Sequence, residues 1–115
     1  MQGLDINRAV DQISSALRAM DEHAHFSAPE LATLTRELLT ADLAFMVASG
    51  VLLADGTPGE SFYDDDDAFE ALCDAVIGAR EGLDEQAEMR IAHLVDDYMD
   101  CAQQYFEASD LLFWE

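Results

Sequence analysis

Acidic side chains are the residues of this sequence whose type and spacing could support a binding chemistry. Four aspartates stand side by side at positions 64–67, and two further acids follow at the one-turn spacing of a helix. A second acidic series lies nearer the end of the sequence, at spacings of four and seven residues. Carboxylates one helical turn apart stand about 5–6 Å from each other, so each series presents a row of negative charge. The ten candidate partner-binding residues are Asp64, Asp65, Asp66, Asp67, Glu70, Asp74, Asp96, Asp97, Asp100 and Glu107.

The aspartate run at 64–67 has structural explanations as well as chemical ones. Acids at a helix N-terminus face the positive end of the helix dipole, and one of them can cap the helix. These two effects account for one or two of the four aspartates. An EF-hand calcium loop needs glycine at its sixth position and glutamate at its twelfth, whereas these positions hold Phe69 and Ala75. We therefore predict no metal centre, and a weak carboxylate site for a cation stays open as the alternative.

The charge of the chain is strongly negative and unevenly distributed. Twenty-five acids oppose five arginines, for a formal net charge of −20, and lysine is absent. Residues 1–50 hold seven acids and three arginines, whereas residues 51–115 hold eighteen acids and two arginines. Like charges one turn apart each cost about 0.2–0.5 kcal/mol, and a merely solvated surface mixes both signs. This uncompensated repulsion predicts a basic protein or nucleoprotein complex as partner, with no direct nucleic-acid binding and no membrane docking.

No arrangement of residues in the sequence indicates catalysis. No serine or cysteine has an identifiable base, and the glycine-containing stretch 56–59 lacks the lysine and the spacing of a phosphate-binding loop. His23 and His25 lie at the end of the first predicted helix, so we interpret them as partners of its dipole, and their two-residue spacing does not favour a zinc pair. Cys73 and Cys101 fall on apolar stripes, which indicates buried, reduced thiols. We predict a protein that is not an enzyme and holds no cofactor.

The segment at 27–49 is the most apolar of the sequence and organises the expected fold. Ser27 and Glu30 have the spacing of a capping box, and Pro29 lies in the first helical turn, where its missing N–H costs nothing. Leucines then recur at helical spacing, and Gly50 follows as a left-handed C-cap. These signals predict one long helix that is surrounded by partners.

Three further helices are predicted around this segment from apolar residues at three- and four-residue spacing. The first runs from a cap at Asp5 to about His23, antiparallel to the helix at 27–49. The third runs from the aspartates to about Ala79, and the fourth from a cap at Asp84 to about Ala108.

An irregular segment at 51–65 separates the second and third predicted helices, because it is rich in turn-forming residues. We expect Val51, Leu52 and Leu53 to fold onto the core, while a two-stranded hairpin is only weakly indicated. The length of 115 residues fits one domain. The prediction is therefore a single all-α domain at 1–115, a small helical bundle of about four helices.

The chain is small, predicted to be helical and free of lysine, and it carries rows of acids at 64–74 and 96–107. In this composition it resembles the nucleic-acid mimics of phages and mobile elements, such as anti-CRISPR and anti-restriction proteins. The resemblance covers about the second half of the chain and rests on composition, not on a motif. It implies a non-enzymatic inhibitor whose carboxylates stand in for DNA or RNA phosphates in a basic groove. It also implies fast association that weakens with salt.

Three other interpretations stay open. The first is an acidic protein-binding module without mimicry, such as an immunity or chaperone-like protein. The second is adaptation to high salt, although that would coat the whole surface and residues 1–50 are nearly balanced. The third is a resemblance of residues 54–56 with Glu60 to the inter-helix loop of tellurite-resistance B-type domains, whose basic residues are absent here.

The apolar segment at 111–114, Leu-Leu-Phe-Trp, is expected to pack on the bundle, and the alternative is an aromatic anchor for a partner or a homodimer. The N-terminus shows neither a basic region nor an apolar run, so no signal peptide is predicted. The expected location is therefore the cytoplasm.

Overall fold

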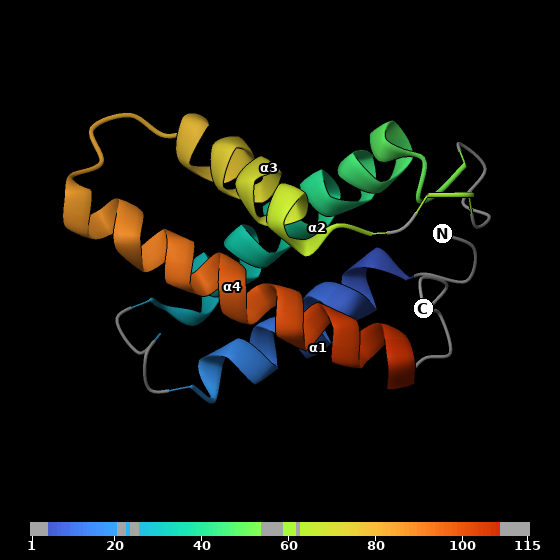
Figure 1. Cartoon of the computed structure of the whole chain (residues 1–115). Helices are drawn as coiled ribbons and strands as arrows, with labels where there is room; N and C mark the ends of the chain where they lie inside the picture. Colours follow the sequence, from blue (N-terminus) through green and yellow to red (C-terminus); the bar gives the residue numbers. More distant parts are fainter. Residues whose placement is uncertain (1–4, 21–22, 24–25, 54–58, 62, 109–115) are drawn as a thin grey trace.

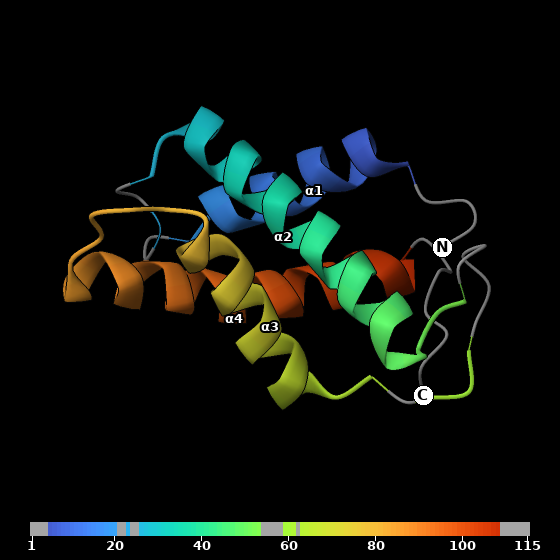
Figure 2. The ribbon, with the colours of Figure 1, turned by 90° about the horizontal axis from the view of Figure 1, so that it is seen from above.

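The structure is a computed structural model that describes residues 5–20, 23, 26–53, 59–61 and 63–108. These residues form four helices, α1 (Ile6–Arg18), α2 (Ala28–Ser49), α3 (Asp65–Gly78) and α4 (Glu85–Ala108). Successive helices run in opposite directions, and α4 closes the arrangement by packing on α1 as well as on α3 (Figures 1 and 2). The predicted all-α bundle of four helices is confirmed.

Local capping fixes both ends of α2, as the sequence predicts. The Ser27 side chain accepts a hydrogen bond from the Glu30 N–H at 3.2 Å, and the Glu30 carboxylate accepts one from the Ser27 N–H at 3.0 Å. Gly50 ends the helix in the left-handed conformation, with φ of 84°. A side chain at this position would be strained, because a Cβ disfavours positive φ. The capping box and the C-cap are both confirmed.

The first helix is shorter than its sequence predicts. Asp5 caps α1 by accepting from the Arg8 N–H, but the helix ends at Arg18, so the prediction that it runs to about His23 is wrong. Beyond it, the Met20 N–H binds the Leu17 carbonyl and the His23 N–H binds the Met20 carbonyl. These hydrogen bonds join residues three positions apart, as in a 3₁₀-helix, and the tighter turns bring His23 to a buried position.

The core lies where the apolar stripes of the four helices meet. Its largest fully buried side chains include Ile13, Leu17, Leu38, Leu94 and Tyr98. Along α4, the apolar residues at helical spacing are buried (Ile91, Leu94, Val95, Tyr98, Ala102 and Phe106), and Tyr105 is only partly covered. The caps of the last two helices also follow the prediction, since the Asp64 carboxylate accepts from two N–H groups and that of Asp84 from one.

The connection between α2 and α3 begins with an extended segment that packs on the core. Val51 and Leu52 are buried as expected, but Leu53 is 52% exposed, so the expectation that it folds onto the core is wrong. The Gly59 N–H binds the Val51 carbonyl at 2.8 Å, and the Ser61 N–H binds the Gly50 carbonyl at 3.1 Å. The predictions for the loop at 54–58 and for the apolar segment at 111–114 concern residues outside the described part of the chain.

None of the helices in the described part of the chain is both long enough and apolar enough to cross a bilayer.

Candidate partner-binding site

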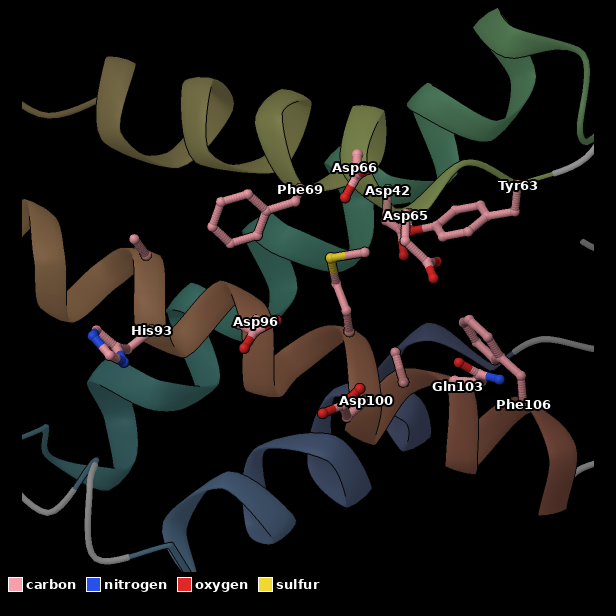
Figure 3. A pocket seen from close by; sticks show the side chains of 13 residues that line it. Asp42, Tyr63, Asp65, Asp66, Phe69, His93, Asp96, Asp100, Gln103 and Phe106 are labelled. Carbon is pink, nitrogen blue, oxygen red and sulfur yellow. Dashed lines mark hydrogen bonds between the residues drawn. The ribbon is translucent and has the colours of Figure 1, made fainter.

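A cavity of about 420 Å³ opens between the N-terminal turn of α3 and the part of α4 from Ala92 to Phe106, and it reaches α2 beneath them. Figure 3 shows the side chains that line it. Its polar residues are Asp42, Tyr63, Asp65, Asp66, His93, Asp96, Asp100 and Gln103, and its apolar residues are Phe69, Ala92, Met99, Ala102 and Phe106. Four of the ten acids singled out in the sequence therefore meet around one cavity, two from each helix.

The periodicity of α4 places its part of this lining. His93, Asp96, Asp100 and Gln103 recur at three- and four-residue spacing and are exposed along one stripe of the helix. The opposite side of the helix carries the buried core residues. Across the cavity, Asp65 and Asp66 belong to the first turn of α3, whose dipole favours negative charge at that end. Helix geometry thus places two carboxylates from each helix in the lining of the same cavity.

The floor of the cavity is a buried carboxylate. Asp42 lies in the middle of α2 and is only 2% exposed. It accepts a hydrogen bond from the Tyr63 hydroxyl at 2.7 Å and another from the Tyr98 hydroxyl at 3.3 Å. Burial raises the pKa of Asp42 to about 6, and these two hydrogen bonds offset part of that increase. The negative charge of Asp65 adds a smaller increase to the pKa.

The two tyrosines serve as hydrogen-bond donors to Asp42. Burial, followed by the negative charge of Asp42, raises the pKa of both Tyr63 and Tyr98 well above the ordinary value. Both hydroxyls therefore keep their protons at any ordinary pH. Asp42 thus ties together three parts of the chain, namely α2, the connection before α3, and α4.

Asp42 did not stand out in the sequence, although its position carried a signal. It occupies the place of a core residue in the series Leu34, Leu38, Asp42, Met46, whose members are four residues apart and all buried. An acid at such a position needs hydrogen-bond partners inside the protein, because an unpaired buried charge is very costly. The sequence does not say which residues those partners are.

The other predicted acids of α3 lie away from the cavity. Asp64 is the N-cap, and its carboxylate accepts from the N–H groups of Asp66 and Asp67. Asp67, Glu70 and Asp74 are exposed, and their i, i+3, i+7 spacing keeps them on one face of the helix, as the sequence predicts. The structure thus divides the acids of α3 between a cavity lining and an outer face, which we call the outer α3 face (Asp67, Glu70 and Asp74).

The two remaining predicted residues have different surroundings. Asp97 is 23% exposed and lies 2.7 Å from Nε2 of His23, which is 1% exposed, so this carboxylate has a partner inside the molecule. His23 is therefore a buried partner of α4 instead of a partner of the α1 dipole. Glu107 lies in the last turn of α4, and its side chain is outside the described residues.

Compensating cations are scarce around these acids. Within the described part of the chain, the acids paired with a basic side chain are Asp97 with His23 and Glu37 with Arg80, the second at 2.6 Å just beyond the end of α3. The four cavity acids and the outer α3 face therefore make no ion pair with any described residue. Their mutual repulsion is not relieved within this part of the molecule.

Two other kinds of site can be checked among the described residues, namely a metal centre and an activated cysteine. Among them, no three His, Cys, Asp or Glu side chains converge so that they could hold a metal ion. Cys73 is half-buried and Cys101 is buried, both are free thiols, and burial raises the pKa of each. Protonated thiols are poor nucleophiles, so neither cysteine is an activated one.

Comparisons of the chain with protein-family models, with curated proteins and with solved structures find no match.

Proposed function

We propose that this protein is a non-enzymatic inhibitor that binds a basic nucleic-acid-handling protein or nucleoprotein complex, presenting carboxylates in place of phosphates. The supporting observation is that the cavity acids and the outer α3 face are exposed, several of them at one-turn spacing, with no cation paired to them among the described residues. A basic groove would relieve the repulsion between these carboxylates on binding.

Electrostatic attraction would dominate the kinetics of such a complex. A net charge of −20 on 115 residues gives long-range steering toward a basic surface. Association then slows steeply as salt is added, because the Debye length falls from about 10 Å at 0.1 M to about 3 Å at 1 M ionic strength.

A second candidate function is an acidic protein-binding module without mimicry. The observation that favours it is the apolar part of the cavity, formed by Phe69, Met99 and Phe106. A mimic of nucleic-acid phosphates has no need of an apolar cavity, because a phosphate strand has none. A protein-binding module can use such a cavity to receive side chains of its partner. Both candidates require a basic partner, and they differ in whether nucleic acid competes for its surface.

Competition with nucleic acid separates the two functions. The tagged protein is used to capture partners from a host lysate at low salt, and parallel samples are eluted with duplex DNA, with RNA and with raised salt. Release by nucleic acid is expected under mimicry. A specific partner that nucleic acid does not release would contradict mimicry and support the module.

Charge reversal then locates the binding surface. Asp100→Lys and Asp74→Lys reverse one acid at the cavity and one on the outer α3 face, and both are exposed. Asp11→Lys is the matched control, because Asp11 is exposed on α1. Each of the first two changes is expected to weaken binding about 10-fold or more, while the control changes it less than about 3-fold. Equal losses in all three would indicate a diffuse charge effect with no dedicated face.

A further inference from the structure

We propose that the cavity between α3 and α4 is a receptor for one arginine side chain of the basic partner. This inference deepens the proposed function and rests on the partner being basic. It names one part of the molecule where recognition is specific, in contrast to the general attraction of an acidic surface.

The size and the lining of the cavity suit an organic cation. Its volume of about 420 Å³ lies within the range of about 300–1,000 Å³ that is usual for ligand pockets. Its apolar lining includes the aromatic and thioether side chains of Phe69, Phe106 and Met99, and carboxylates from both helices line it as well (Figure 3). An inorganic ion would leave the apolar part of this surface unused.

Arginine matches this combination better than lysine does. Its guanidinium is planar and weakly hydrated, it stacks on aromatic rings, and it binds carboxylates through two parallel hydrogen bonds. A lysine ammonium is a compact and strongly hydrated charge, so apolar walls offer it less. A guanidinium in the cavity would meet carboxylates on two sides and the Phe69 ring beside them.

The buried floor is an observation independent of the acids at the opening. Asp42 lines the cavity while being 2% exposed, and no described cation pairs with it. Its neighbours are two protonated tyrosines, Tyr63 and Tyr98, and the acid Asp65. A guanidinium entering the cavity would supply the positive charge that this buried carboxylate lacks. Without that cation, the ionised carboxylate of Asp42 is stabilised by the two tyrosine hydroxyls and by what little solvation its burial allows.

The first test measures binding of a small probe. N-acetyl-arginine amide is titrated into the ¹⁵N-labelled protein, and amide chemical shifts report where it binds. We expect shifts concentrated at the cavity, around Phe69, Met99 and Asp100, and weaker binding by N-acetyl-lysine amide. Spermidine forms a third arm, which separates a free polyamine from a partner's side chain as the source of the cation. Spermidine binding tighter than the arginine probe, or shifts spread evenly over all acidic surfaces, would overturn the inference.

Matched variants separate the cavity from general charge. Asp96→Asn with Asp100→Asn removes two charges at the cavity, and Asp67→Asn with Asp74→Asn removes two from the outer α3 face. The first pair is expected to weaken the arginine probe about 10-fold, and the second less than about 2-fold. Equal weakening by both pairs would contradict a specific receptor. The amide spectrum of each variant shows that it is folded.

A proton measurement tests whether the cation reaches the floor. A guanidinium near Asp42 favours its ionised form, so probe binding at pH 6 should release protons, detected by calorimetry in two buffers of different ionisation enthalpy. Asp42→Asn should abolish this release while the other cavity carboxylates still bind the probe. Persistence of the release in this variant would remove Asp42 from the receptor.

The outcome for the cavity can be distinguished from the outcome for the proposed function. A partner that is captured from lysate and released by nucleic acid, while the arginine probe fails to shift the cavity residues, would leave mimicry standing and overturn the receptor. Binding of the probe at the cavity, together with a captured partner whose arginine-to-lysine variants bind unchanged, would also overturn the receptor.

Discussion

Two carboxylates inside this bundle, Asp42 and Asp97, have opposite surroundings. Asp97 of α4 is partly exposed and lies against the imidazole of His23, a group that can carry positive charge. Asp42 of α2 is buried, and its hydrogen-bond donors are two neutral tyrosine hydroxyls. The first carboxylate holds a loop against a helix. The second lies at the floor of a cavity without a described cation, and burial there makes its ionised form costly.

The largest expected effect concerns the pH dependence of stability at Asp42. Its pKa is about 6 in the folded protein against an ordinary 3.8, so the folded state binds more protons between these values. The stability linked to this group is fully present below pH 3.8 and is lost as the pH rises through 6. The difference corresponds to about 3 kcal/mol.

Asp42→Asn removes this titration while keeping a side chain of similar shape. The unmodified protein loses this contribution as the pH rises, whereas the variant does not. The free energy of unfolding of the variant minus that of the unmodified protein should therefore increase by up to about 3 kcal/mol from pH 4 to pH 7.5. Urea denaturation of both proteins across this pH range measures the difference. The surface acids are the same in both proteins, so their contribution cancels in the subtraction. A constant difference at every pH would show that Asp42 titrates normally.

The next effect concerns the partner of Asp97. His23→Ala should lower the free energy of unfolding by about 2 kcal/mol, because it leaves a void at a buried site and removes the hydrogen bond that joins the chain after α1 to α4. His93→Ala, at an exposed position of α4, is the matched control and should change stability by less than about 0.5 kcal/mol. Similar losses in both variants would mean that the His23 contact adds little.

A smaller effect is expected from one of the donors to Asp42. Tyr98→Phe removes a hydroxyl that donates at 3.3 Å and leaves the ring in place, so it should cost about 1–2 kcal/mol at pH 7.5. It should also raise the pKa of Asp42 further, because that hydrogen bond favours the ionised carboxylate. The cost of the substitution should therefore shrink at pH 4.5, and thermal unfolding at the two values tests this. An equal cost at both would argue against the link.

The smallest effect is expected at the cavity opening. Asp100→Asn removes an exposed charge that repels its neighbours, so stability should change by less than about 0.5 kcal/mol, in the stabilising direction at low salt. A thermal melt at low and at high salt checks the sign. Clear destabilisation would mean that this acid serves the fold, which would weaken its assignment to binding.

The sequence alone determined the elements of the bundle. The capping box of Ser27 and Glu30, the left-handed Gly50, the caps at Asp5 and Asp84 and a cap from the aspartate run at 64–67 were all predictable. Such bonds join residues two to four positions apart, so the pattern that encodes them is visible in a short window. The sequence also determined that the second half of the chain carries most of the negative charge.

The tertiary structure alone decided which acids form a cavity and which have partners. Asp96, Asp97 and Asp100 look alike in the sequence, yet two of them line the cavity and Asp97 meets His23, which is 74 residues away along the chain. The bond between Tyr98 and Asp42 joins residues 56 positions apart. Contacts of this range depend on how the helices pack against one another, and the spacing of residues within a single helix carries no record of that packing.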